Sequence, residues 1–444
     1  MRDLFFAAIL PFMLYPMAKR PFIALGMWIW TALFFPNAWM YGFAAALRYN
    51  LLFTAIAILG YVVLQDKPKA KFGALGGAIF LFLAWTTVSS TMTLALPDVS
   101  WEIWLRFFKV VLLFVFIVLI IDKKLHIDFF LWCVILSVGF YGAVEALKFI
   151  FSGGGHHIEG FAGHVLGDRN ELALAFVITL PICFYLLDEY GQRSKIVWMG
   201  LLGLMGLLVA AIIGTQSRGG MIALVGLAGY LFLKTKRKFS FLVLTGILLF
   251  GLSFFVSEEW MSRMDTIGQA DQDSSFMGRV VAWKLSFIMA VNHPLFGGGF
   301  KALEYFPNWL ALSDQFGNFP FFYTGGLEPD TNKPHAAHSV YFQVLGEHGF
   351  AGLAIYLWML ATAFLTAKRT AAAARKVAGA EWINTLATMI QLCIFSFCLG
   401  GAALSFAYFD LMFALYGIIV VLRLRILPAL AKDQAKDQAK DQAT

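Results

Sequence analysis

Residues 195–214 read KIVWMGLLGLMGLLVAAIIG, a stretch in which Lys195 is the one charged side chain. About 20 consecutive apolar residues are what an α-helix needs to cross the hydrocarbon core of a bilayer. The rest of the chain shares this character, because 60% of its 444 residues are hydrophobic and only 14% are charged. Soluble domains carry about 25% charged residues. The sequence therefore predicts an all-α polytopic membrane protein.

Similar apolar runs on both sides of this stretch predict about twelve transmembrane helices, nine within residues 1–256 and three within residues 338–427. The predicted spans are 21–36, 40–64, 72–90, 104–121, 128–150, 170–187, 195–214, 218–233, 240–256, 338–367, 383–404 and 406–427. The first apolar stretch, 4–17, contains two prolines and is interpreted as interfacial or re-entrant. Residues 428–444 repeat Ala-Lys-Asp-Gln and are predicted to be a low-complexity cytoplasmic tail, either a frayed helix or disordered.

The net charge of +7 is spread over short loops between the predicted spans. The basic clusters are Lys67, Lys69 and Lys71; Lys234, Lys236, Arg237 and Lys238; Lys368, Arg369, Arg375 and Lys376; and Arg423 and Arg425. By the positive-inside rule these loops are cytoplasmic, and so are both ends of the chain. This distribution argues against nucleic acid as a partner. The four cysteines lie within apolar spans and are interpreted as small buried hydrophobic residues.

Residues 257–337 interrupt the apolar pattern and predict a large external loop between helices 9 and 10. Within this loop, residues 276–291 have the apolar spacing of an amphipathic helix, with Arg279 and Lys284 expected on its polar side. Asn292-His293-Pro294 follows and predicts the end of this helix.

Three arginines at predicted external positions are candidates for binding phosphate, because guanidinium offers two parallel donors to a phosphate group. They are Arg218, within Gly214-Thr215-Gln216-Ser217-Arg218-Gly219-Gly220, Arg279 in the loop helix, and Arg169. The alternative for Arg218 is an interfacial arginine, and for Arg279 a solvated helix face. Asp168 or Asn170 is expected to cap the helix that follows.

His338 lies where the external loop becomes a helix, and an imidazole with a pKa near 6.5 can accept a proton at neutral pH. His338 is therefore the candidate general base, with His335 a weaker one. Three histidines in the loop 151–169 raise the possibility of a metal site, but their spacing matches no ligand motif. No metal or other cofactor is expected. Glu347 is interpreted as a structural hydrogen-bonding residue within the bundle.

Three segments in this order resemble the superfamily of O-antigen ligases and O-antigen polymerases. The segments are Thr215-Gln216-Ser217-Arg218-Gly219-Gly220; Gly278-Arg279-Val280-Val281-Ala282-Trp283, continuing to Asn292-His293-Pro294-Leu295-Phe296-Gly297-Gly298-Gly299-Phe300; and His338-Ser339, followed by Glu347, Gly349 and Gly352. Asp168-Arg169-Asn170-Glu171-Leu172-Ala173 is also similar to a segment of this family. The resemblance runs from about residue 160 to residue 360.

The resemblance implies a glycosyltransferase in the inner membrane of a bacterium, with its active site facing the periplasm. The donor would be a glycan on undecaprenyl diphosphate and the acceptor a sugar hydroxyl of lipid A-core. His338 would take the role of the essential histidine, and Arg218 and Arg279 those of the essential arginines. The same motifs serve O-antigen polymerases and protein O-oligosaccharyltransferases. A transporter of lipid-linked glycans is the alternative from another class, and inverted repeats would be its mark.

Overall fold

The computed structural model describes residues 2–235, residues 238, 239, 242, 243, 246, 250 and 251, and residues 274–441. All regular structure in this part of the chain is helical, which confirms the predicted all-α fold class. Most of the predicted span 240–256, and the first part of the predicted loop 257–337, lie outside the described residues.

The first part of the chain contains ten α-helices, joined by short 3-10 and π-helical turns. The helices are α1 (Arg2–Lys19), α2 (Pro21–Phe34), α3 (Tyr49–Val63), α4 (Gly73–Thr91), α5 (Pro97–Ile120), α6 (Lys124–Val134), α7 (Phe140–Phe151), α8 (Arg169–Tyr190), α9 (Lys195–Gly214) and α10 (Arg218–Lys234). The shorter turns are η1 (Pro36–Trp39), η2 (Phe43–Ala46) and η3 (Ile135–Gly139), the last of which joins α6 to α7.

The second described part contains both the external-loop helices and the C-terminal spans. Its elements are α13 (Ser274–Asn292), α14 (Phe306–Ser313), η5 (Phe316–Asn318), α15 (Val340–Ala374), α16 (Glu381–Gly400), η6 (Gly401–Ala403), α17 (Asp410–Val421), η7 (Leu422–Ile426) and α18 (Leu427–Asp441).

Eight described helical stretches are long and apolar enough to cross a membrane, as a multi-pass membrane protein requires. They are Gly73–Thr91, Pro97–Ile120, Lys124–Phe151, Arg169–Tyr190, Lys195–Gly214, Val340–Ala374, Glu381–Ala403 and Asp410–Ala439. Two shorter apolar helices, Pro21–Phe34 and Tyr49–Val63, fall on the first two predicted spans. Helix α10 has 17 residues and coincides with the predicted span 218–233. The predicted count of twelve stays a prediction.

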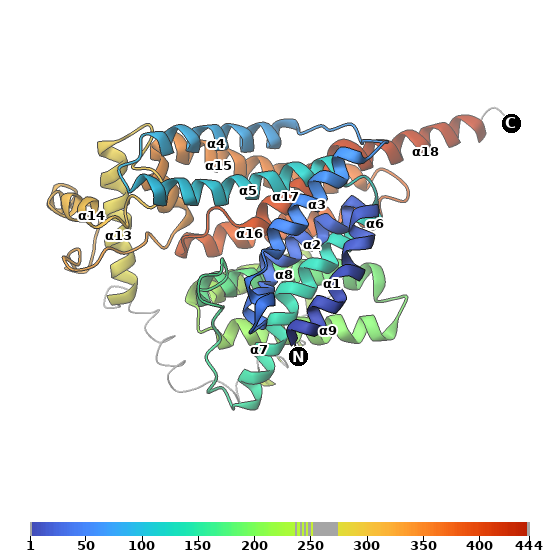
Figure 1. Cartoon of the computed structure of the whole chain (residues 1–444), viewed down its shortest axis with the longest axis horizontal. Coiled ribbons are helices and arrows are strands. Elements are labelled where there is room, and N and C mark those ends of the chain that lie inside the picture. Colours follow the sequence, from blue (N-terminus) through green and yellow to red (C-terminus); the bar gives the residue numbers. More distant parts are fainter. Residues whose placement is uncertain are drawn as a thin grey trace.

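The spans pack into one bundle in which α4, α5 and α15 lie side by side, with α13 crossing their ends (Figure 1). Helices α8, α16 and α17 form much of the interior, and every residue from Leu411 to Val421 of α17 is buried. Helix α13 packs against α15 and contacts α14, so the described part of the predicted loop rests on the bundle as a folded layer.

The predicted loop helix at 276–291 is confirmed as α13, which ends at Asn292 as expected. The placement of Lys284 on its polar side was wrong. Lys284 is only 4% exposed, and its Nζ lies 3.8 Å from the centre of the Phe316 ring. The physical reason is that α14 and η5 fold back over this face of α13 and form a small second core that includes Trp309.

The C-terminal repeat forms a helix as far as the structure describes it, and α18 continues α17 through η7 and points away from the bundle (Figure 1). Of the two predicted states for this tail, a frayed helix or disorder, the described residues show the helix.

Candidate functional site

His338 is held by two hydrogen bonds that reach it from distant parts of the chain. The indole Nε1 of Trp283 on α13 donates to the carbonyl of Ala337 at 2.7 Å, and the N–H of His338 donates to Ser405 Oγ at 2.8 Å. The Trp283 ring also stacks on Phe342 of α15, with centroids 5.2 Å apart and planes 3° apart. The peptide group that joins Ala337 to His338 is therefore fixed on one side to α13 and on the other to Ser405.

The backbone of His338 is itself in an unusual conformation, with φ +46°. A non-glycine residue in the left-handed region costs about 1–3 kcal/mol and persists only where the surroundings enforce it. Gln216, two residues before Arg218, has the same kind of backbone, with φ +53°. Such residues concentrate at functional sites, so both positions support a site at this end of the bundle.

Arg279 lies one helical turn before Trp283 on α13, and its charge acts on His338. Burial, and next the positive charge of Arg279, hold the pKa of His338 below its ordinary value of 6.5, while Asp168 and Glu304 act in the opposite direction. The imidazole is therefore mainly neutral at pH 7, which is the form that can accept a proton.

Arg169 and Arg218 start two neighbouring helices that are joined by a side-chain hydrogen bond. Ser217 Oγ, which caps α10, donates to Asn170 Oδ1 at 2.8 Å. Asp168 caps α8 by accepting from the N–H of Asn170, which confirms the predicted cap. Because Asp168 also acts on the charge of His338, the start of α8 belongs to the same neighbourhood as the candidate base.

The start of α10 also approaches the segment that anchors His338. A Cβ built on Gly219 would lie 3.4 Å from side-chain atoms of Ala403 and Leu404, directly before Ser405. The four predicted site residues, His338, Arg279, Arg169 and Arg218, are all half-buried. The structure thus links the starts of α8 and α10 to the segment that anchors His338, while Arg279 comes from α13, which packs against α15.

A break in α15 joins the loop 294–299 to the bundle. Gly349 has φ +72° inside the helix, so the helical hydrogen bonds are interrupted there. Gly298 N–H donates to the Gly346 carbonyl at 2.9 Å, and Phe350 N–H donates to the Pro294 carbonyl at 2.9 Å. The loop 294–299 therefore satisfies backbone groups that the break leaves open, as buried non-helical backbone in a membrane protein must.

Close backbone approach explains the glycines in this loop. A Cβ on Gly297 would lie 2.5 Å from the backbone nitrogen of His348, and one on Gly349 would lie 2.6 Å from the Pro294 carbonyl oxygen. No larger side chain fits either position without displacing backbone. The glycine pattern after Pro294 is therefore a docking surface for α15.

A buried chain of hydrogen bonds runs behind this docked loop. Glu347 accepts from the backbone N–H of Lys301 at 3.1 Å and from the hydroxyl of Tyr408 at 2.6 Å. The Tyr408 oxygen lies 2.9 Å from His348 Nε2, and His348 Nδ1 lies 2.9 Å from Ser89 Oγ. Glu347 thus has the structural hydrogen-bonding role predicted for it.

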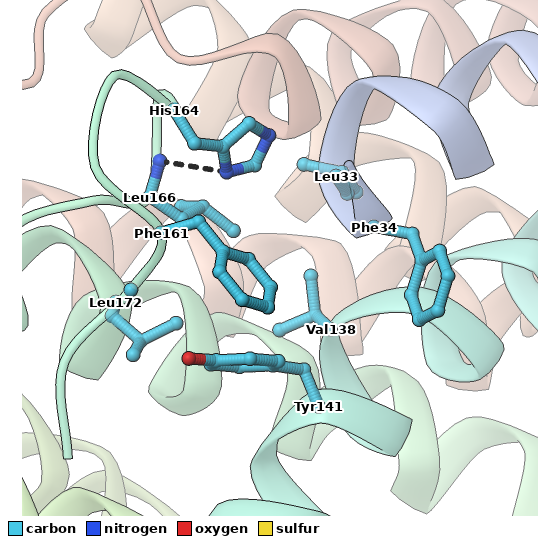
Figure 2. Close-up of a pocket in the computed structure, with 9 residues that line it drawn as sticks. Leu33, Phe34, Val138, Tyr141, Phe161, His164, Leu166 and Leu172 are labelled. Carbon is cyan, nitrogen blue, oxygen red and sulfur yellow. Dashed lines mark hydrogen bonds between the residues drawn. The ribbon is translucent and has the colours of Figure 1, made fainter. Parts of the chain in front are cut away.

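Two of the three histidines of the 151–169 loop, His156 and His164, contact separate partners. His156 Nε2 lies 2.6 Å from Glu145 Oε2. His164 accepts at Nδ1 from the N–H of Leu166, as Figure 2 shows, and its Nε2 lies 2.9 Å from the Ala32 carbonyl. Both ring nitrogens of His164 are therefore occupied by backbone groups. Within the described ranges, no three histidine, cysteine or acidic side chains lie close enough together to hold a metal ion.

A cavity of about 570 Å³ lies next to the site. Ser405, which holds the N–H of His338, lines this cavity, together with Glu171 of α8 and Lys301 of the docked loop. Lys301 has φ +61°, and its Nζ donates to Glu304 at 2.7 Å. A substrate in this cavity would therefore lie beside the backbone that carries the candidate base.

Sequence reasoning missed the residues that hold His338 in place. Trp283 was part of the motif without an assigned role, and its spacing of four residues from Arg279 was a signal that both lie on one face of a helix. Ser405 gave no signal at all, because a serine between two apolar spans is ordinary. Lys301 lies in the predicted loop 257–337 and had no assigned role.

Two family models match this chain. Residues 1–191 match a family of unknown function, and residues 201–357 match the model described as O-antigen ligase. No curated protein matches the chain. The second match includes Arg218, Arg279 and His338, and it covers the docked loop and the break in α15 at Gly349. Residues 201–357 are therefore similar to the O-antigen ligase family.

Proposed function

We propose that this protein transfers a glycan from undecaprenyl diphosphate to a sugar hydroxyl of lipid A-core at the periplasmic face of the inner membrane. The observation that carries the proposal is the setting of His338, a half-buried imidazole with a lowered pKa beside Arg279. The similarity of residues 201–357 to the family supports a lipid-linked glycan as donor and lipid A-core as acceptor.

In the proposed reaction, His338 removes the proton from the acceptor hydroxyl as the hydroxyl oxygen attacks the anomeric carbon of the donor glycan. The bond between that carbon and the diphosphate oxygen breaks, and undecaprenyl diphosphate leaves. General base catalysis of this kind contributes about 10²–10⁴-fold. The reaction is a single displacement, so the anomeric configuration inverts.

The arginines are assigned the role of stabilising the diphosphate leaving group. Negative charge grows on the diphosphate as the glycosidic bond breaks, and Arg218 and Arg279 would stabilise it, with Arg169 as a further contact. Pre-positioned donors at a developing charge are worth about 2.7–4 kcal/mol each. No step in this scheme requires a metal ion.

The test is transfer by the purified full-length protein, given the lipid-linked glycan and lipid A-core. We expect His338→Ala to lower the rate at least 100-fold with the melting temperature kept, whereas His335→Ala retains transfer, because His335 is exposed and faces Asp330. Rates that are equal in the two variants would remove His338 from the mechanism.

Two further readouts complete this test. NMR of the new linkage gives its anomeric configuration, and retention would exclude a single displacement. Replacing lipid A-core by a second lipid-linked glycan, or by a serine-containing protein, separates the ligase from a polymerase and from a protein O-oligosaccharyltransferase. A product formed only with one of those acceptors would reassign the function within the family.

A further inference from the structure

The cavity beside His338 is formed mainly by the part of the chain that matches a family of unknown function. Most of its lining residues lie within residues 1–191, and the remainder come from the docked loop, α15 and the segment 405–410. The volume of about 570 Å³ falls in the range of small-molecule sites. The N-terminal region therefore contributes a wall to a space that reaches Ser405, the residue that holds the backbone of the candidate base.

Two cations of α5 face this space. Arg106 and Lys109 both line the cavity and are three residues apart, so they lie on one side of the helix. Helix α5 is one of the membrane-crossing candidates, and the two residues lie about 14 and 18 Å along it from Pro97. Cations inside a spanning helix are costly and mark pathways for substrates or ions.

The charge of these cations is only partly neutralised by the protein. Arg106 pairs with Glu102 at 2.6 Å, but both side chains are more than 60% exposed, and exposed pairs bind weakly. The side chain of Lys109 forms no hydrogen bond or ion pair with any residue that the structure describes. The cavity therefore presents positive charge to a ligand.

The acidic residues in the cavity wall lie away from the pair Arg106 and Lys109 in the sequence and have other surroundings. Glu171 and Asp410 lie in the first turns of α8 and α17, and Glu171 interacts electrostatically with Lys301, which lines the same cavity. Lys301, the third cation of the wall, is paired with Glu304 at 2.7 Å. Arg106 and Lys109 remain as the groups suited to an anion.

Apolar side chains surround these cations, so the space suits an amphiphile. Trp28, Phe107 and Phe406 are among the lining residues. We propose that this cavity binds the phosphorylated head group of a lipid substrate and that Arg106 and Lys109 are its phosphate-binding groups. A hydrocarbon tail by itself gains nothing from two cations. The inference rests on the proposed function, in which both the donor and the acceptor are lipids that can carry phosphate.

Binding of defined lipids to the purified full-length protein, measured by native mass spectrometry in detergent, tests this assignment. The lipids are undecaprenyl diphosphate, bisphosphorylated lipid A and, as the uncharged reference, undecaprenol. We expect the double variant Arg106→Gln/Lys109→Gln to bind at least one phosphorylated lipid about ten-fold or more weakly, because it loses charged hydrogen bonds. If the double variant loses affinity for undecaprenyl diphosphate, the cavity binds the donor. If it loses affinity for lipid A, the cavity binds the acceptor.

Two control variants separate this effect from a loss of folding or of an ion pair. Arg193→Gln removes an exposed cation that is paired at i,i+4 spacing with Glu189 outside the cavity, and binding should not change. Glu102→Gln removes the partner of Arg106 but keeps both cations, and binding should be kept or strengthened. Melting temperatures check that each variant is folded.

Three results would overturn the proposal. In the first, the wild-type protein binds undecaprenol as tightly as undecaprenyl diphosphate, and the wild type and the double variant bind lipid A equally well. Another is a double variant that is folded and binds both phosphorylated lipids normally. The third is equal weakening by Arg193→Gln. Binding needs no turnover, so a protein that binds phosphorylated lipid through Arg106 and Lys109 but transfers no glycan would refute the proposed function alone.

Discussion

The replacement Ser405→Ala tests how the tertiary structure holds the candidate base. Ser405 Oγ accepts the backbone N–H of His338 at 2.8 Å, while His338 keeps a left-handed backbone at φ +46°. Leaving a partly buried donor without a partner costs about 1–3 kcal/mol. The strain of the left-handed backbone also costs about 1–3 kcal/mol, so the free energy of the hydrogen bond is comparable to the strain that it offsets. Without the hydroxyl, we expect the imidazole to lose its position.

A loss of about 1–3 kcal/mol in the transition state corresponds to a kcat about 5- to 150-fold lower. The KM for the donor should change little, because Ser405→Ala leaves Arg218 and Arg279 in place. Steady-state rates of glycan transfer by the purified protein give both constants. Ser405→Thr keeps a hydroxyl and should restore most of the rate.

The matched control is Ser396→Ala. Ser396 is a buried serine of α16 whose Oγ has no hydrogen-bond partner among the described residues, so its removal should leave kcat unchanged. A normal kcat in Ser405→Ala, or an equal loss in Ser396→Ala, would refute the role given to the hydrogen bond on His338.

Three further predictions concern the surroundings of the same site. Arg279→Gln removes a charge that lowers the pKa of His338, so the pKa rises and the acid limb of the rate against pH moves to higher pH, as a pH profile of kcat/KM will show. Trp283→Phe loses the 2.7 Å bond to the Ala337 carbonyl, so kcat should fall roughly 5- to 150-fold in the same transfer assay. Gly349→Ala forces a side chain into a left-handed position against backbone, which lowers stability by at least about 1–2 kcal/mol in thermal unfolding.

Each of these predictions has a control within the chain. Arg279→Lys keeps the positive charge and should leave the acid limb near its wild-type pH, whereas an unmoved limb in Arg279→Gln would exclude the electrostatic effect on His338. Gly229→Ala places a Cβ in open space on α10 and should not lower the melting temperature. A normal kcat in Trp283→Phe would show that the indole bond does not position the base.

The sequence predicted the elements that local chemistry controls. Apolar runs fixed the all-α class and most of the spans, since a helix is the way a single segment can satisfy its backbone within lipid. The amphipathic spacing located α13, and the cap of α8 by Asp168 followed from the preference of aspartate for that position. The site residues could be named in advance through the order of motifs along the chain, and their roles stay predictions.

The tertiary structure decided the contacts between segments that a hydropathy pattern cannot relate to one another. His338 is anchored by Ser405, 67 residues away, and Ala337 by Trp283, 54 residues away. Lys284 was misplaced because the sequence does not show that α14 folds over α13. The cations Arg106 and Lys109 appear in sequence only as charges in an apolar run, and the fold is what turns them toward the cavity. Apolar patterning records whether a residue prefers lipid or water, whereas packing between helices sets which polar groups meet.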